Sequence, residues 1–458
     1  MDASPFFTHS LQDGRVARIL STALEAVEPG AAVRRYLESH PLPPARRVFA
    51  LGLGKAATPM TQALSRFAHL TRALVVTKHA SSLTDVPAST TVPSMGIIES
   101  GHPVPDARSL AAGEAALEFV SALQADDLLV CLISGGGSAL MTAPLVPLED
   151  LQALTSALLA CGARIDEINT LRRRLDRVKG GGIAKATQAR VLSLILSDVV
   201  GSPLEAIASG PTAPDPTTKE DALAALEKYG LSTNAQRARC LHRSSRNVKK
   251  ISENSRKLAD SLPRSILYSL LSAPETPKPG DPLFARVQNV IVGDNALAVR
   301  AALEQAKKEG FRAIDLGSDW QGEARQVGVE LVRRLRSAAT ENPSPVCMVA
   351  GGETTVTLTG GGKGGRNQEL ALAAVPELAD APDLMLVSLA TDGEDGPTDA
   401  AGAASSGETR QRAERLGLTA AGHLSRNDAY PFFEALGDLL KIGPTGTNVN
   451  DLVVLLKF

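Results

Sequence analysis

The stretch LVCLISGGGSALM, residues 129–141, runs from an unbroken apolar segment into three consecutive glycines and a serine. An apolar run of this kind is typical of a strand in a parallel sheet that is covered on both faces. Because glycine lacks a Cβ, the backbone N–H groups of Gly135, Gly136 and Gly137 can surround an anion where the next helix starts. A tight turn without a ligand explains a single glycine cluster equally well, so other parts of the chain must decide.

Similar apolar runs recur along the chain and alternate with segments of helical periodicity. In the first half we expect strands at RRVFALGLG (46–54), RALVVTK (72–78), 127–133 and RVLSLILSD (190–198). In the second half the strand candidates are 287–292, 311–316, 345–350, 354–359, 384–390 and 451–457. Near-continuous apolar strands between helices predict an α/β fold with mostly parallel sheets covered by helices.

A chain of 458 residues is too long for one ordinary hydrophobic core. We expect an N-terminal Rossmann-like α/β domain at 1–232, a basic and proline-rich linker at 233–283, and a C-terminal α/β domain at 284–458. Residues 237–265 are basic but contain no interleaved aromatic side chains. This composition favours a solvated tether over a surface that binds nucleic acid.

The composition predicts a cytoplasmic protein that acts on small molecules. The formal charge of −2 gives no general attraction to nucleic acid or to anionic membranes. No apolar run approaches the roughly 20 residues needed to span a bilayer, and the sequence MDASPFFTHS lacks the features of a signal peptide. The cysteines are far apart, so we expect neither a disulfide framework nor a zinc ribbon; they are Cys131, Cys161, Cys240 and Cys347.

The segment ALGLGKAA, residues 50–57, has the glycine spacing of a dinucleotide-binding turn. That fold also needs an acidic residue at the end of the second strand to hold a ribose, and Lys78 stands there instead. Lys55 directly follows Gly54 at an expected helix start, where a cation is badly placed for the helix dipole. An anionic ligand between this lysine and the nearby amides would explain its position.

A third glycine-rich segment, GGGKGGRNQE at 360–369, ends with Arg366 at another expected helix start. None of these loops fits the Walker A pattern. Asp198 ends one apolar strand, and Asp392 ends another and is followed by Glu394, Asp395 and Asp399. Cations in glycine loops and carboxylates at strand ends together predict a nucleotide bound with Mg²⁺, which prefers oxygen ligands.

The motifs that carry these features occur in the order of a known family. They are GLGKAA, SGHPVPD, LISGGGSAL, INTLRRRLDRVKGGGIA, LILSDVVGSPLEAIASGPT, VIVGDN, GGETTVTLTGGGKGGRNQELAL, TDGEDGPTDAAGA and GPTGTNVNDL. With these motifs the chain resembles the type II glycerate 2-kinase family, whose members were often labelled hydroxypyruvate reductases. The resemblance covers nearly the whole chain except residues 232–282.

The resemblance implies two α/β domains with the active site in the cleft between them, and a homodimer is one possible assembly. It implies ATP- and Mg²⁺-dependent phosphorylation of D-glycerate at the 2-hydroxyl; the residue types alone do not select this hydroxyl. The expected catalytic residues are Lys55, Arg366 and Asp198. The expected nucleotide loop is Ser134, Gly135, Gly136, Gly137 and Ser138. Substrate binding is expected from Lys55, Arg366, Glu353 and Asn367, and metal binding from Asp198 and Asp392.

Two other functions fit parts of this pattern. One is an NAD(P)H-dependent hydroxypyruvate reductase, against which Lys78 argues because it replaces the ribose-binding acid. The other is a non-catalytic nucleotide-binding module, which would not require both cations and both acidic clusters.

Overall fold

The computed structural model describes residues 3–78, 95–101, 104–231, 263–342 and 344–458. The chain divides into two compact units. Unit 1 comprises Met1–Arg35, Leu196–Ser202 and Val292–Phe458, and unit 2 comprises Tyr36–Ile195 and Pro203–Ile291. Most of the expected linker, residues 232–262, lies outside the described residues.

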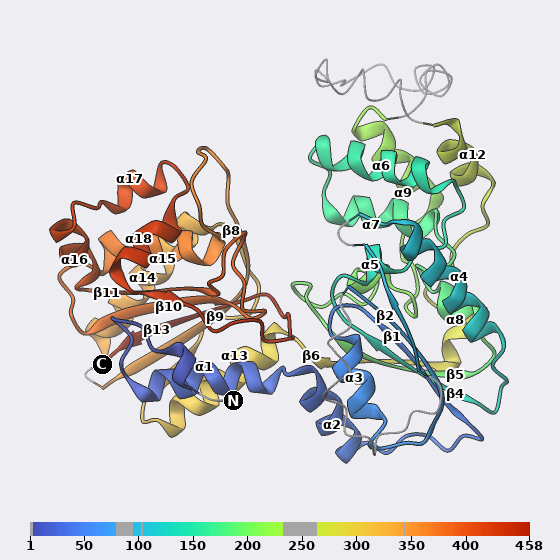
Figure 1. The fold of residues 1–458 in the computed structure, drawn as a ribbon, viewed down its shortest axis with the longest axis horizontal. Helices are drawn as coiled ribbons and strands as arrows, with labels where there is room; N and C mark the ends of the chain where they lie inside the picture. The colour runs from blue at the N-terminus through green and yellow to red at the C-terminus, as the bar shows by residue number, and fades with distance from the viewer. Residues whose placement is uncertain (1–2, 79–94, 102–103, 232–262, 343) are drawn as a thin grey trace. The chain divides into compact units, whose positions relative to one another are not determined.

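Unit 2 is built on a six-stranded sheet (Figure 1). Its spatial order is β3 (Met95–Glu99), β2 (Leu70–Thr77), β1 (Val48–Leu53), β4 (Leu128–Ile133), β5 (Arg190–Leu196) and β6 (Val287–Gly293). The pairs from β3 to β5 are parallel. Every residue of β4 is buried, as its unbroken apolar sequence predicts. The parallel α/β expectation is confirmed for this unit.

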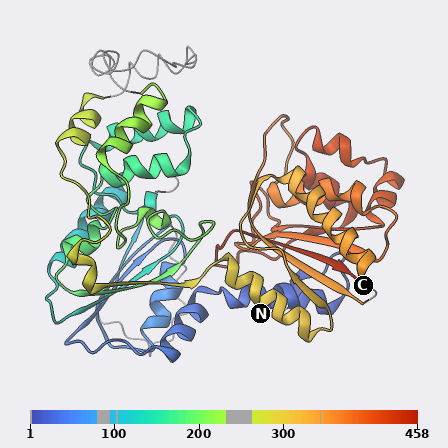
Figure 2. The same ribbon diagram turned by 180° about the vertical axis from the view of Figure 1, so that it is seen from behind.

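Helices cover both faces of this sheet (Figure 2). Four further helices pack against one another and form a small core of their own. α6, α7, α9 and α12 pack together through side chains such as Leu154, Leu171, Leu226 and Leu270. α12 therefore belongs to this core, although its residues fall in the range expected to be a linker. The helices are α2 (Pro29–Ser39), in which the division between the units falls, α3 (Ala57–Leu64), α4 (Ala107–Ser121), α5 (Gly137–Leu140), α6 (Leu148–Ala160), α7 (Ile165–Arg174), α8 (Gly182–Ala186), α9 (Lys219–Lys228) and α12 (Arg264–Ser272), with the 3₁₀ turns η3 (Ile207–Ser209) and η4 (Pro282–Arg286).

Unit 1 contains a mixed sheet rather than a mostly parallel one. Its spatial order is β12 (Leu439–Leu440), β11 (Gly402–Ser406), β10 (Leu384–Ala390), β13 (Asp451–Lys457), β9 (Val346–Thr355) and β7 (Arg312–Asp315), and β8 (Trp320–Glu323) also pairs with β9. β10 is antiparallel to both neighbours, and β13 is antiparallel to β9. Antiparallel strands that are buried on both faces have the same unbroken apolar sequence as parallel ones, so the pattern could not separate the two.

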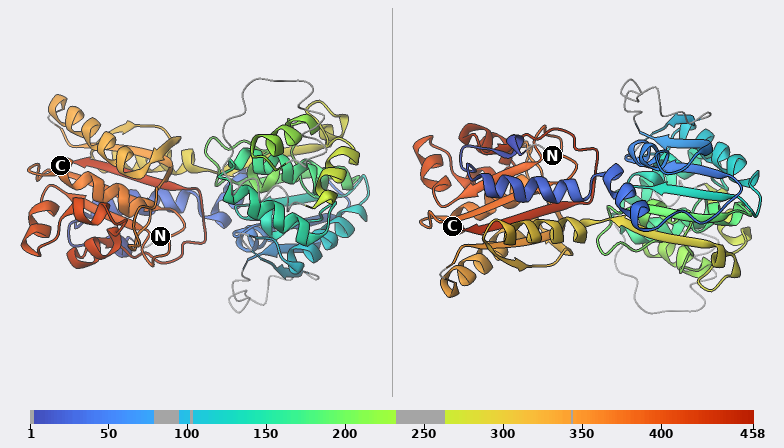
Figure 3. Two further views of the ribbon diagram at one scale, coloured as in Figure 1. Left: turned by 90° about the horizontal axis from the view of Figure 1, so that it is seen from above. Right: turned by 90° about the horizontal axis from the view of Figure 1, so that it is seen from below.

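The sheet of unit 1 lies between two layers of helices. One layer contains α14 (Ala324–Glu341), α15 (Arg366–Leu378) and α18 (Ala429–Leu436), with α16 (Thr409–Arg415) and α17 (Ala420–Leu424) beside them. The other contains α1 (Gly14–Ala26) and α13 (Asn295–Lys308), which lie side by side on the opposite face (Figure 3). A short turn, η1 (Ser4–Phe6), precedes α1. Among the helices of the described residues, none combines the length and the apolar character that crossing a bilayer requires.

Candidate functional site

Two loops of unit 2 meet where the strand order of its sheet reverses. β1 and β4 are neighbours, but the chain continues outward to β2 on one side and to β5 on the other. In parallel α/β sheets, ligands bind outside the carboxyl ends of the strands at such a switch point. The loop after β1 carries Lys55, and the loop after β4 is 134–138. The structure therefore places these two predicted elements next to each other.

A glycine allows the two loops to touch. Gly54 has a φ of +117°, and a Cβ there would lie 2.4 Å from the carbonyl oxygen of Ser134. The N–H of Lys55 donates to the carbonyl of Gly135 at 3.0 Å, and the N–H of Ala56 donates to the Ser134 hydroxyl at 3.0 Å. These two amides are used within the protein. The amides of Lys55 and Ala56 are therefore not available to an anion, and an anion held between Lys55 and other nearby amides stays a prediction.

The ammonium group of Lys55 remains available. Lys55 is exposed, and within the described residues its side chain has neither a hydrogen-bond nor an ion-pair partner. It stands just before α3, whose N-cap residue Ala56 provides no side-chain cap. The positive end of this helix and the lysine repel each other, so a bound anion would stabilise both.

The amides of the second loop are also available. Gly136 has a φ of +86° and precedes α5. In the described part of the chain, the N–H groups of residues 135–138 have no protein acceptor. The hydroxyl of Ser138 is instead paired with that of Ser209 at 2.8 Å. A run of amides without acceptors fits the oxygens of a phosphate, so this loop has the donors that a nucleotide needs.

Unit 1 contains a cavity of about 730 Å³ whose lining includes four of the predicted residues. These are Asp198, Glu353, Arg366 and Asp392. The cavity lies at the sheet edge where β10 ends and β13 begins, because Ala390 pairs with Asp451 there. The described lining has one cation, Arg366, and six carboxylates: those of Asp198, Glu353, Glu369, Asp392, Glu394 and Asp395.

Arg366, the first residue of α15, is held by two acidic side chains. Its Nε and one terminal nitrogen donate to the two oxygens of Asp451 at 2.6 and 3.0 Å. The other terminal nitrogen donates to Glu353 at 2.8 Å. Burial would lower the pKa of Arg366, but the carboxylates of Asp451 and Glu353 outweigh burial and raise that pKa. Three of the five N–H groups are engaged, which leaves two for a ligand in the cavity.

Asn367 is buried and is not part of the cavity lining. Its side chain donates to Asp395 at 3.3 Å and accepts from Ser388 at 2.7 Å. Its expected contact with the substrate stays a prediction.

A buried carboxylate occupies the start of α15. The backbone N–H groups of Asn367 and Gln368 donate to Asp395 at 3.1 and 2.9 Å. A Cβ at Gly365 would lie 2.3 Å from the Cγ of Asp395, which explains a glycine there. Burial, with the nearby charge of Asp451, raises the pKa of Asp395 to about 7 against these hydrogen bonds. The first amides of α15 are therefore bound by the protein itself, and binding of an anion by the Arg366 side chain stays a prediction.

The predicted metal ligands offer the oxygen donors that Mg²⁺ prefers. Asp198 and Asp392 are half-buried in the lining, and the N–H of Glu394 donates to Asp392 at 3.2 Å. The described residues contain no group of three or more His, Cys, Asp or Glu side chains placed to hold a metal ion. Mg²⁺ is commonly held by one or two carboxylates together with phosphate oxygens. These donors fit Mg²⁺ that arrives with a nucleotide.

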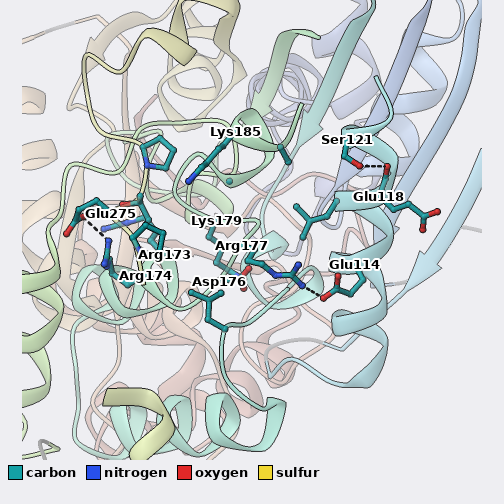
Figure 4. Close-up of a pocket in the computed structure, with 17 residues that line it drawn as sticks. Glu114, Glu118, Ser121, Arg173, Arg174, Asp176, Arg177, Lys179, Lys185 and Glu275 are labelled. Atoms are coloured by element: carbon teal, nitrogen blue, oxygen red, sulfur yellow. Dashed lines mark hydrogen bonds and ion pairs between the residues drawn. The ribbon is translucent and has the colours of Figure 1, made fainter. Parts of the chain in front are cut away.

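Unit 2 also has a cavity of about 840 Å³ between α4, α8 and residues 274–277 (Figure 4). Its charged side chains are largely paired: Arg174 with Glu275 at 2.8 Å, Arg177 with Glu114, and Lys179 with Asp176. Because these pairs compensate their charges, the cavity does not select a ligand by charge.

Sequence reasoning missed Asp451 and the capping role of Asp395. Asp451 starts β13, 85 residues after Arg366, and it sets the orientation of the guanidinium. Both acids lie in motifs noted above, and an acidic residue at the first position of an apolar strand was the available signal. Their partners could not be inferred, because they depend on which strands are neighbours.

By fold and site, the chain is an α/β protein with a loop of amides that lack acceptors in the described part of unit 2 and a cavity lined by carboxylates in unit 1. Residues 15–242 match a domain of unknown function named DUF4147, and residues 346–451 match the MOFRL family.

Individual relatives are more specific. The chain is 38% identical to the D-glycerate 2-kinase of Thermotoga maritima over 444 residues, which cover 95% of this chain and 96% of the relative. It is also 36% identical to a putative hydroxypyruvate reductase of Agrobacterium vitis, over 96% of this chain and 93% of the relative. The crystal structure of glycerate kinase from Thermotoga maritima superposes with a TM-score of 0.82, at 37% identity, over 96% of this chain and 98% of that one. The chain belongs to the glycerate kinase family.

Proposed function

We propose that this chain is a glycerate 2-kinase, which transfers the terminal phosphoryl group of ATP to the 2-hydroxyl of D-glycerate. The observation that carries the proposal is the match to D-glycerate 2-kinase over nearly the full length of both chains. The donors found in each unit agree with it. The substrates are small molecules, and the cytoplasmic location and the homodimer stay predictions.

The 134–138 loop is our candidate for the phosphates of ATP. Its amides at 135–138 lack protein acceptors in the described structure, and Lys55 lies beside them without a partner there. Phosphoryl transfer needs positioning and charge stabilisation more than covalent chemistry from the protein. The amides would orient the phosphates, and Lys55 would offset the charge that develops on the transferring group.

Mg²⁺ would be held by Asp198 or Asp392, whose carboxylates line an acidic cavity. When bound, the metal supplies positive charge that neutralises phosphate oxygens. Glu369 is paired with Arg325 and Asp395 caps α15, but the carboxylates of Asp198, Glu353, Asp392 and Glu394 still outnumber Arg366 and would otherwise repel an anionic substrate. This charge imbalance supports a cation requirement.

Arg366 and Glu353 are the candidates for holding glycerate. The two unused N–H groups of Arg366 can donate to the glycerate carboxylate in the planar arrangement that guanidinium favours. Glu353 is already oriented by Arg366 and can accept a hydrogen bond from a hydroxyl of the substrate.

The proton of the 2-hydroxyl would pass to a carboxylate as that oxygen attacks phosphorus. The new O–P bond forms while the bond from the terminal phosphorus to the bridging oxygen of ADP breaks, so the products are 2-phosphoglycerate and ADP. The acceptor would be whichever of Asp198 and Asp392 does not hold Mg²⁺, and Asp198 is our candidate.

Two measurements test the proposal. Incubation with ATP, MgCl₂ and D-glycerate should give an ester whose phosphorus signal is a doublet from coupling to the single proton at C2. A triplet, which reports attachment at C3, or no ATP-dependent product would contradict the assignment.

Thermal denaturation separates the alternatives. Saturating ATP should raise the melting temperature, since a ligand at 100 times its Kd stabilises by about 2.7 kcal/mol. The reductase requires the same response to NADH, and a non-catalytic module requires stabilisation by ATP without product. The strand order of unit 2 is also that of dinucleotide-binding folds, but the end of β2 carries the exposed Lys78 in place of the acid.

A further inference from the structure

One face of α7 approaches the segment that follows the 134–138 loop. Asn169 and Arg172 are three residues apart on α7, so their side chains lie on the same face, and Asp176 follows two residues after the helix ends at Arg174. At one end, the hydroxyl of Ser209 donates to Asn169 at 3.2 Å and is also paired with Ser138 at 2.8 Å.

Asp176, just after the end of α7, binds the residues just beyond α5. Its carboxylate accepts from the backbone N–H of Ala143 at 3.0 Å and from the hydroxyl of Thr142. Lys179 binds the same carboxylate and the carbonyl of Met141; Asp176 and Lys179 are labelled in Figure 4. Asn169, through Ser209, and Asp176 directly therefore connect this part of the chain to residues 138–143.

In sequence, Arg172 lies between Asn169 and Asp176. It is half-buried, yet in the described residues its guanidinium has neither a hydrogen-bond nor an ion-pair partner. Its neighbours differ: Arg173 is bound to Asp215 at 2.8 Å and Arg174 to Glu275 at 2.8 Å. A guanidinium that is partly removed from water without a counter-ion destabilises the fold, unless a ligand supplies the missing charge.

The surrounding charges leave this site positive. Burial lowers the pKa of Arg172, and Asp176 only partly opposes this effect. Burial also lowers the pKa of Lys179. The carboxylate of Asp176 opposes this effect, and the positive charge of Arg172 adds to it. Two cations share one carboxylate, and that carboxylate is already bound by Lys179 and by the backbone.

We propose that Arg172 is a nucleotide-binding residue that completes the phosphate site of the 134–138 loop. This inference rests on the proposed function, because it takes the anion of that loop to be ATP. The amides would contact the phosphates through backbone N–H groups, and Arg172 would add the planar fork that binds two phosphate oxygens at once.

The test compares Arg172→Met with the wild type by calorimetric titration of ADP, tripolyphosphate and D-glycerate, each with MgCl₂. Loss of a charged hydrogen-bonding partner should weaken ADP and tripolyphosphate binding by roughly 10- to 100-fold. Binding of D-glycerate should stay within about twofold, as for an interaction not made with that ligand. Arg172→Lys should restore part of the ADP affinity, because it keeps the charge but not the fork.

Melting temperatures of the ligand-free proteins distinguish a ligand contact from a structural role. Arg172→Met should not lower the melting temperature, because it removes a charge without a partner. Arg173→Met should lower it, because Asp215 is left buried and unpaired. Lys185→Met, which removes an exposed cation of the same unit, should change neither stability nor affinity.

Unchanged ADP affinity in Arg172→Met, a loss confined to D-glycerate, or a fall in melting temperature like that of Arg173→Met would each overturn the inference. Tripolyphosphate binding that depends on Arg172, in a protein that does not bind ADP, would support the anion site and contradict the kinase proposal. The two proposals therefore fail separately.

Discussion

Lys55 and Arg366 both follow a glycine at the start of a helix, yet the folded chain places their side chains in different surroundings. Arg366 donates three hydrogen bonds to Asp451 and Glu353, whereas Lys55 has no partner among the residues the structure describes. The residue type and position of both cations were predictable from sequence. Their partners were not, because Asp451 reaches Arg366 only through the pairing of β13 with β9. Lys55 can therefore move to a ligand, while Arg366 is already oriented.

This difference gives a prediction for Lys55→Met. If the ammonium stabilises the transferring phosphoryl group, kcat should fall by roughly 10²- to 10³-fold, the usual effect of losing one preorganised donor. The melting temperature should hardly change, because the side chain is exposed and contacts no described partner. Steady-state kinetics measure the first effect and thermal denaturation the second. Lys78→Met, another exposed lysine of unit 2, is the control, and an equal kcat in both variants would exclude the assignment.

Three glycine-rich helix starts look alike in sequence, but the elements around them differ. Before α3, the amides of Lys55 and Ala56 bind the neighbouring loop. At the start of α15, Asp395 accepts hydrogen bonds from the amides of the first turn. Before α5, amides 135–138 have no acceptor in the described chain. The glycines predicted that another group comes close to the backbone at all three helix starts. Which group comes close is set by the tertiary fold.

The cap of α15 should make stability depend on pH. Because the pKa of Asp395 is raised from 3.8 to about 7, mainly by burial, the folded state keeps a proton that the unfolded state loses in this range. The unfolded state binds fewer protons there, so the contribution of Asp395 to the free energy of unfolding falls as pH rises from about 4 to about 7, by at most about 1.4 kcal/mol per pH unit. In Asp395→Asn this contribution is absent. The stability of wild type relative to the variant should therefore decrease with rising pH.

Denaturant titrations across this pH range measure the difference. Asp399→Asn is the control, because hydrogen bonds from Tyr430 and Lys441 lower the pKa of Asp399 and move its titration below the range. For that variant the difference from wild type should stay constant between about pH 5 and about pH 8. A constant difference for Asp395→Asn as well would show that Asp395 does not titrate there.

At the scale of the whole molecule, the sequence predicted the α/β class and most strands, but not how the segments combine. The expected ranges were contiguous, whereas the compact units are interleaved along the chain. α1 packs on α13 and contributes Val16, Ile19 and Leu20 to the core of unit 1. Helical periodicity shows that α1 has an apolar face, but it carries no information on which sheet that face covers. Contact between residues so far apart in sequence could be found only in the folded structure.

This interleaving leads to a prediction about local stability. Leu20 is fully buried in the core that α1 shares with α13, β9 and β13. Leu20→Ala should cost about 2–5 kcal/mol, the usual range for a cavity left by a buried leucine. The loss should appear in unit 1, since compact units can open separately. Amide hydrogen exchange should therefore lose protection in β9 and β13 and keep it in β1 and β4. Leu132→Ala, at a fully buried position of β4, should give the reverse pattern. If Leu20→Ala instead lowered protection mainly in β1 and β4, residues 1–35 would belong with the strands that follow them in sequence, and the division into these two units would be wrong.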